Sequence, residues 1–171
     1  SLNNIDVTGY DKFNPEYNNI EKLFGCDIIF LCLPTPFNDN LKKYNLESID
    51  ENIKILSTNN FKGLVVLKST VTPETTNNLS FRYSNLKICH NPEFLTAKTA
   101  FEDFHNQKHI VIGYSNNVKK SETRLLKNFY SKYYPTSKIS ICTSTESESM
   151  KSFCNCFYAV KIQFFNELYS L

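Results

Sequence analysis

Three side chains in this sequence have the types and spacing needed for proton transfer and for stabilising negative charge. Glu93 follows Asn91 and Pro92 at the end of an apolar run, and Lys151 and Asn155 stand four residues apart in a helical segment. A carboxylate beside a water molecule can act as a general base. An ammonium and an amide one helical turn apart can both donate to a single oxyanion. Glu93, Lys151 and Asn155 are therefore candidate catalytic residues.

Other polar residues follow other apolar runs. Asp11 closes the first run, Pro34 and Thr35 follow the second, and Ser69 and Thr70 follow the third. The carboxyl ends of parallel strands meet at one edge of a sheet, where ligands bind, so these residues predict a crevice. A carboxylate at the position of Asp11 suits a ribose hydroxyl, which favours NAD because the 2′-phosphate of NADP would be repelled.

Each of these residues also has a purely structural interpretation. Asp11 could simply end a strand, and Ser69 could cap the following helix, which Pro73 near the helix start favours. Lys151 could face solvent. Asn155 is harder to explain in this way, because asparagine is a poor helix former and this one shares a face with Lys151.

The elements that would hold these residues alternate along the chain. Apolar, β-branched runs predict strands at 5–11, 27–33, 63–69, 86–91, 109–113 and 138–142. Helical patterns lie at 17–24, 46–58, 74–80, 97–104 and 117–131. The alternation predicts an α/β fold, a Rossmann-like and mostly parallel sheet with flanking helices.

From Thr145 the chain reads as one uninterrupted helix to Leu171, the start of a long central helix. Thr145 and Glu148 match the T-x-x-E pattern of a capping box at its start. One side of this helix is broadly apolar and would be exposed unless another helix or domain covered it.

Composition excludes several classes of protein. The 171 residues are 41% hydrophobic and 21% charged, with a net charge of +2, which fits a soluble domain and gives no basis for nucleic-acid binding. No apolar run approaches the roughly 20 residues of a membrane span. The six cysteines form no C-x-x-C pair, so we expect no metal site and reduced thiols in a cytoplasmic protein. The chain starts without Met and ends in a helical pattern, which predicts a fragment.

Four segments together resemble the UDP-glucose/GDP-mannose 6-dehydrogenase family. FLCLPTP is similar to the strand and V-P-T-P loop of that family, and VVLKSTVTPETT to its K-S-T-V-x-P-x-T-T segment. NPEFLTAKTAFEDF resembles N-P-E-F-L-R-E-G-x-A-x-x-D-F. ESMKSFCNCFYAVKIQFFNEL resembles the helix A-E-x-x-K-x-x-x-N-x-F-x-A-x-K-I-x-F-x-N-E. The resemblance implies that 1–144 is a partial NAD-binding domain and that 145–171 begins the central helix.

The resemblance implies NAD as the cofactor and assigns residues to it. Asp11 would bind the adenosine ribose, and the loop with Pro34 and Thr35 would lie along the cofactor. Ser69 and Thr70 would contact the cofactor as well, and Thr70 would also hold a water or polar network near the reacting carbon.

The resemblance also implies a reaction, the oxidation of the C6 alcohol of UDP-glucose to UDP-glucuronate with two NAD⁺ in succession. Glu93 would handle protons in the hydrolysis of a thioester intermediate, and Phe94 and Leu95 would line the nucleotide sugar. Lys151 and Asn155 would stabilise the oxyanion at C6. The family dimerises through the long helix, which implies a homodimer.

The chain departs from the family pattern in three places. Ala97 stands where the family has a second acid. No G-x-G-x-x-G turn precedes Asp11, and no cysteine stands in the G-F-G-G-x-C context of the family's nucleophile. The resemblance leaves GDP-mannose as the alternative substrate, and UDP-N-acetylmannosamine ranks third, because members that oxidise it usually have a different sequence in place of N-P-E-F-L. A catalytically inactive module that only associates through 145–171 stays open, as does another NAD-dependent dehydrogenase of the hydroxy-acid or 6-phosphogluconate type.

Overall fold

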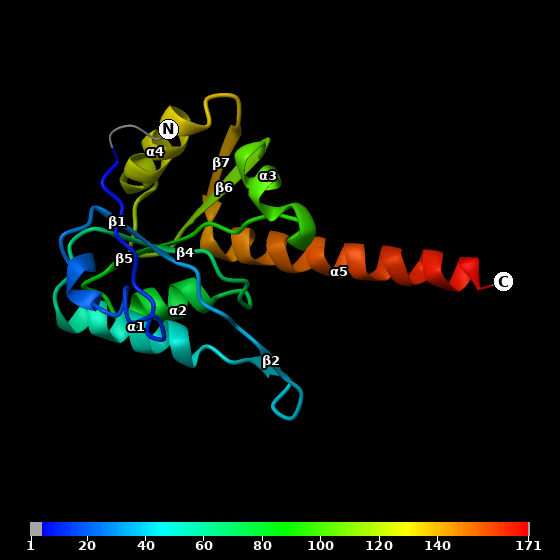
Figure 1. Cartoon of the computed structure of the whole chain (residues 1–171), viewed down its shortest axis with the longest axis horizontal. Coiled ribbons are helices and arrows are strands. Elements are labelled where there is room, and N and C mark those ends of the chain that lie inside the picture. Colours follow the sequence, from blue (N-terminus) through cyan, green and yellow to red (C-terminus); the bar gives the residue numbers. More distant parts are fainter. Residues whose placement is uncertain (1–4, 171) are drawn as a thin grey trace.

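The computed structural model describes residues 5–170, which form a five-stranded sheet between layers of helices (Figure 1). The strand order is β1-β4-β5-β6-β7. These strands are β1 (Ile28–Leu31), β4 (Leu64–Leu67), β5 (Lys87–His90), β6 (His109–Tyr114) and β7 (Lys138–Thr143). Within this five-stranded sheet of the described residues, three strand pairs are parallel and the β5–β6 pair is antiparallel, so the predicted Rossmann-like, mostly parallel sheet is confirmed.

The helices cover both faces of this sheet. Helices α1 (Glu47–Thr58) and α2 (Thr75–Arg82) pack on one face, and α4 (Arg124–Tyr133) packs on the other, with α3 (Ala100–His105) beside it. Short 3₁₀ turns, η1 (Ile20–Leu23), η2 (Ala97–Thr99) and η3 (Lys120–Thr123), lead into later elements. A two-stranded hairpin, β2 (Phe37–Asn38) and β3 (Lys43–Tyr44), extends from the body. The last helix, α5 (Ser144–Tyr169), starts against the sheet and runs out beyond it (Figure 1).

Strand β4 is the centre of the core. All four of its residues are buried, as the continuous apolar run predicts for a strand covered on both faces. Val65 and Leu67 face the cluster that includes Ile53 of α1, whereas Leu64 and Val66 face the α4 side. Each such side chain contributes about 1.5–3 kcal/mol when fully buried. The strand that carries Ser69 and Thr70 at its end is thus firmly held.

The predicted strand 5–11 is wrong. Asp11 lies in a local turn, in which its Oδ1 accepts from the N–H of Phe13 at 2.9 Å and its own N–H donates to the carbonyl of Tyr17 at 3.1 Å. Val7 is 77% exposed. A strand needs a ladder partner, and β1 is the edge strand on this side of the sheet among the described residues. Residues 5–11 do not pair with this free edge of β1, so they form no strand in the described part of the chain.

The start of α5 also differs from the prediction. The capping box is formed by Thr143 and Glu146, because Glu146 accepts from the N–H of Thr143 at 2.8 Å and Thr143 Oγ1 accepts from the N–H of Glu146. Glu148 points elsewhere, since it is fully buried and accepts from the N–H groups of Glu74 and Thr76, each at 2.7 Å. Leu171, the last residue of the predicted helix, lies outside the described residues.

Glu148 thus caps α2, a role that the structural interpretation of the sequence allowed for Ser69. The N-cap residue of α2 is Glu74, which has a φ of 75° and makes no side-chain capping bond itself. The carboxylate comes instead from a helix more than 70 residues further along the chain. This contact joins the start of α2 to the first turns of α5.

Candidate functional site

A polar cavity of about 430 Å³ opens where β1, β4 and β5 end. Its lining contains six of the residues proposed from the sequence together with three others. They are Cys32, Leu33, Pro34, Thr35, Lys68, Ser69, Thr70, Glu93 and Lys151. Three separate strand ends and one helix thus meet at one place, as the crevice prediction requires.

The loops after β1 and β4 are joined to each other by hydroxyl groups. Ser69 Oγ donates to the carbonyl of Leu33 at 2.7 Å and accepts from the Leu33 N–H at 3.1 Å. Thr35 Oγ1 donates to the carbonyl of Thr70 at 2.7 Å. These bonds explain why hydroxyl residues stand at positions 35 and 69, because the two hydroxyls hold one wall of the cavity in place.

The corner that carries Glu93 is fixed by Asn91, which is 1% exposed. The Asn91 Oδ1 atom accepts from Lys68 Nζ at 3.1 Å and from the hydroxyl of Tyr130. Its Nδ2 donates to the carbonyl of Val111 at 2.6 Å. Buried polar groups bonded in this way are costly to disrupt. The Asn-Pro-Glu sequence is therefore a rigid strand-to-loop corner rather than a solvated turn.

Lys151 reaches this corner from α5. Its Nζ donates to the backbone carbonyl of Glu93 at 2.5 Å and lies 5.4 Å from the centre of the Phe94 ring. Burial lowers the pKa of the Lys151 ammonium from its usual value, while the negative charge of Glu93 opposes that change. The ammonium is thus held at the cavity with N–H donors left for a ligand oxygen.

Four predicted residues do not line the polar cavity. Asp11 is exposed and lies in the turn described above, and Leu95 is half-buried outside the lining. Asn155 is exposed one turn beyond Lys151. Phe94 is also absent from the lining, although its ring contacts Lys151.

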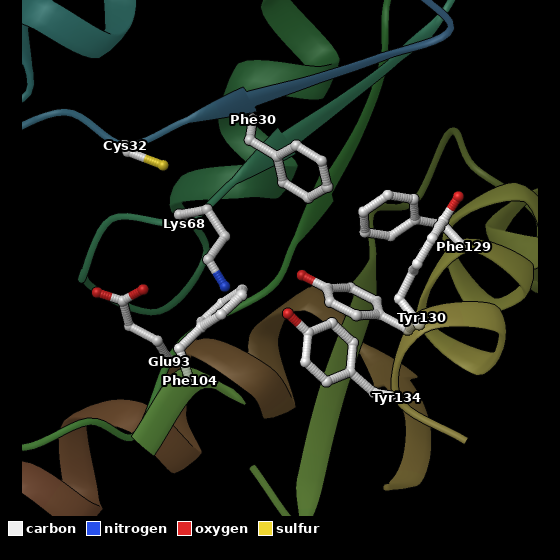
Figure 2. Close-up of a pocket in the computed structure, with 9 residues that line it drawn as sticks. Phe30, Cys32, Lys68, Glu93, Phe104, Phe129, Tyr130 and Tyr134 are labelled. Carbon is white, nitrogen blue, oxygen red and sulfur yellow. The ribbon is translucent and has the colours of Figure 1, made fainter. Parts of the chain in front are cut away.

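Lys68 is the main residue that the sequence analysis missed. It is only 9% exposed, and it lines both the polar cavity and a neighbouring aromatic cavity of about 230 Å³ (Figure 2). Burial lowers the pKa of the Lys68 ammonium, and Glu93 is the main opposing charge. A lysine directly after the apolar run GLVVL was the available signal, because lysine is rarely buried without a role.

The aromatic cavity lies between β1, α3 and α4. Figure 2 shows rings from all three elements around the Lys68 ammonium. The rings belong to Phe30, Phe104, Phe129, Tyr130, Tyr133 and Tyr134. Cys32 lies between the two cavities, and burial raises the pKa of its thiol, so the thiolate is disfavoured there. We assign no nucleophile to this chain.

Ala97 has a clear consequence at the site. It begins η2 on the exposed surface, so no second carboxylate accompanies Glu93 in the polar cavity. The charged groups that act on Glu93 are instead Lys68 and Lys151.

Among residues 5–170 no cluster of His, Cys, Asp and Glu could hold a metal ion. No helix in this range is long and apolar enough to cross a membrane.

The sheet and the cavity at its carboxyl edge have the architecture of a Rossmann-type dinucleotide-binding domain. Residues 7–134 match the NAD-binding domain of the UDP-glucose/GDP-mannose dehydrogenase family, and the chain belongs to this family. NAD is the cofactor that this domain binds.

Individual relatives agree with this assignment. The chain is 34% identical over 167 residues to a UDP-glucose 6-dehydrogenase of Rickettsia felis, covering 94% of this chain and 36% of the relative. A UDP-glucose dehydrogenase structure from Pyrobaculum islandicum gives a TM-score of 0.76 at 28% identity, over 86% of this chain and 35% of that one. A GDP-mannose dehydrogenase ternary complex from Pseudomonas aeruginosa gives 0.73 at 27% identity, over 86% and 36%. The chain therefore spans little more than a third of the length of these relatives.

Proposed function

We propose that this chain is the cofactor-side part of a nucleotide-sugar 6-dehydrogenase that oxidises UDP-glucose to UDP-glucuronate in two NAD-linked steps. The observation that carries the proposal is the meeting of Thr70, Glu93 and Lys151 around one cavity at the carboxyl edge of the sheet. The named relatives support UDP-glucose as the first choice of substrate, with GDP-mannose as the alternative.

The residues present fit one end of NAD. The polar cavity is lined by Pro34, Thr35, Ser69 and Thr70, which would hold the nicotinamide-ribose end. NAD, when bound, accepts hydride from the C6 carbon of the sugar. The four glycines of this chain, Gly9, Gly25, Gly63 and Gly113, form no G-x-G-x-x-G turn, so the chain holds no such cradle for the pyrophosphate. Asp11 remains our candidate for the ribose at the adenosine end.

The protein groups would act on protons and on charge. Lys151 Nζ, already fixed by the Glu93 carbonyl, would donate to the oxygen at C6 as negative charge develops there. Asn155, one turn further along α5, would donate to the same oxygen when substrate lies against the helix. Glu93 would accept a proton from water in the hydrolytic step, and Thr70 would orient that water. Phe94 and Leu95 would line the nucleotide sugar.

Association through α5 is a second part of the proposal. Beyond the sheet, α5 exposes large apolar side chains, among them Phe153, Phe157 and Phe164, each more than 60% exposed. Such a surface favours burial against another helix, and we propose a homodimer. The same surface supports the alternative of a catalytically inactive association module, so the activity assay below also decides between the two.

The test uses the protein expressed from its complete reading frame. NADH formation is followed with UDP-glucose and with GDP-mannose, and we expect turnover with UDP-glucose. Lys151→Ala should lower kcat by about 100-fold or more if the ammonium stabilises the oxyanion. Lys127→Ala, which changes an exposed lysine of α4, is the matched control and should leave kcat unchanged. Turnover of Lys151→Ala near that of the control would refute the role of Lys151, and absence of turnover with both sugars would refute the dehydrogenase.

A further inference from the structure

The first turns of α5 pack closely against the sheet at Gly113 of β6. A Cβ atom on Gly113 would lie 2.6 Å from Ser147 Cβ and 2.9 Å from Ser144 Cα, so only glycine leaves room for the helix. Ser147 lies one turn before Lys151, and both therefore lie on the same face of α5. This face meets the end of β5, where the Asn-Pro-Glu corner begins.

At that point Ser147 meets a fully buried histidine. His90 Nδ1 lies 2.8 Å from Ser147 Oγ, and His90 Nε2 lies 3.4 Å from the carbonyl of Ser69. A carbonyl oxygen can only accept, which assigns the ring hydrogen to Nε2 and leaves Nδ1 as the acceptor for the serine hydroxyl. Lys68 and Lys151 are charged neighbours that, together with burial, keep this ring neutral.

We propose that His90 and Ser147 form a positioning pair that sets the register of α5 against the sheet and thereby delivers the Lys151 ammonium to the Glu93 corner. Together with the Lys151 contact, this pair holds α5 against the corner at two points. Ser147 binds His90, and one turn later Lys151 binds the carbonyl of Glu93, three residues after His90.

Other polar contacts of the first turns of α5 run to α2 rather than to the corner, as for Ser144 Oγ, which donates to Asn77 Oδ1 at 3.2 Å. Glu148 lies on a neighbouring side of α5 and binds the start of α2, so it holds α5 against α2 and not against β5. The catalytic use of Lys151 rests on the proposed function, whereas the register of α5 does not.

The test reads the position of Lys151 directly in the 171-residue chain by NMR. Because Nζ lies over the ring of Phe94, the ε-methylene protons of Lys151 should be shifted upfield, and those of Lys54, an exposed lysine of α1 with no aromatic residue one helical turn away, should not. In Ser147→Ala and in His90→Leu, we expect the Lys151 shift to move to the position of Lys54. His90→Asn keeps an acceptor at the place of Nδ1 and should retain the upfield shift.

A change that only weakens the fold would not produce this pattern, because a folded chain of lower stability keeps its native shifts. An unshifted Lys151 in the unmodified chain, or an upfield Lys151 retained in both folded Ser147→Ala and His90→Leu, would overturn the proposal. Ser147→Ala removes a single oxygen atom, so it provides the answer if His90→Leu fails to fold. The NMR measurement contains no NAD and no sugar. Its outcome therefore does not depend on whether the protein is active in the dehydrogenase assay.

Discussion

Replacement of Glu148 should destabilise the domain more than its place on a helix would indicate. In Glu148→Gln one carboxylate oxygen becomes an NH₂ group that must face the N–H of Glu74 or Thr76, so two donors meet. An unsatisfied buried donor costs about 1–3 kcal/mol. In Glu148→Ala both N–H groups and the Thr76 hydroxyl lose their acceptor, and we expect a loss of about 3–5 kcal/mol.

Such a loss is a large part of the 5–15 kcal/mol or so that stabilises an ordinary domain. Urea unfolding followed by circular dichroism measures it, and amide exchange at Thr76 should accelerate in parallel. Glu167→Gln, an exposed position on the same helix, is the matched control and should stay within about 0.5 kcal/mol. Equal urea midpoints for Glu148→Gln and this control would refute the capping of α2 by Glu148.

Three further predictions concern buried groups. Burial lowers the pKa of His90 from 6.5 to about 4. As the pH falls, the unfolded chain therefore takes up the proton before the folded chain does. The free energy of unfolding should decrease by up to about 3 kcal/mol between these two pH values. Urea midpoints at pH 7 and pH 4 measure this loss, which should be smaller in His90→Asn. Gly113→Ala should destabilise the chain by about 1–3 kcal/mol, because the new methyl group meets the helix backbone; unchanged thermal unfolding would contradict the close approach. Burial raises the pKa of Cys89 to about 12, so a thiol reagent should label exposed Cys156 and spare Cys89 in the folded chain, and equal labelling rates would contradict this burial.

The parts of the fold that the sequence predicts well are those decided by local pattern. The run around Leu64–Leu67 is apolar at every position, which is typical of a strand covered on both faces. The predicted strand 5–11 also contains β-branched residues and is wrong, because a strand forms only when it pairs with a neighbouring strand. Strand pairing involves residues that are far apart in the chain, so a local sequence pattern does not predict it.

The start of α5 shows the same limit on a smaller scale. The sequence contains two overlapping T-x-x-E patterns, one from Thr143 and one from Thr145, and local chemistry does not distinguish them. The structure uses the first pattern, since Glu148 is taken by the N–H groups of α2.

The candidate site could be predicted where motifs end strands, and it could not where the contact is tertiary. Ser69, Thr70 and Glu93 were found because parallel strands bring their ends together. Lys68 was missed, because its importance lies in burial beside Asn91 and the aromatic rings. The His90–Ser147 contact spans 57 residues and has no local pattern at all.

The projection of α5 beyond the sheet makes it a lever (Figure 1). The helix would turn about its contact with the sheet at Ser147. At a rise of 1.5 Å per residue, Lys151 lies about 6 Å along α5 from Ser147, and Tyr169 lies about 33 Å from it. A sideways displacement of about 3 Å at the far end therefore moves the ammonium by about 0.5 Å. That is the distance over which a site gains or loses its productive alignment. A displacement of the far end of α5 would therefore move the Lys151 ammonium about one fifth as far, which changes its alignment but leaves it at the cavity.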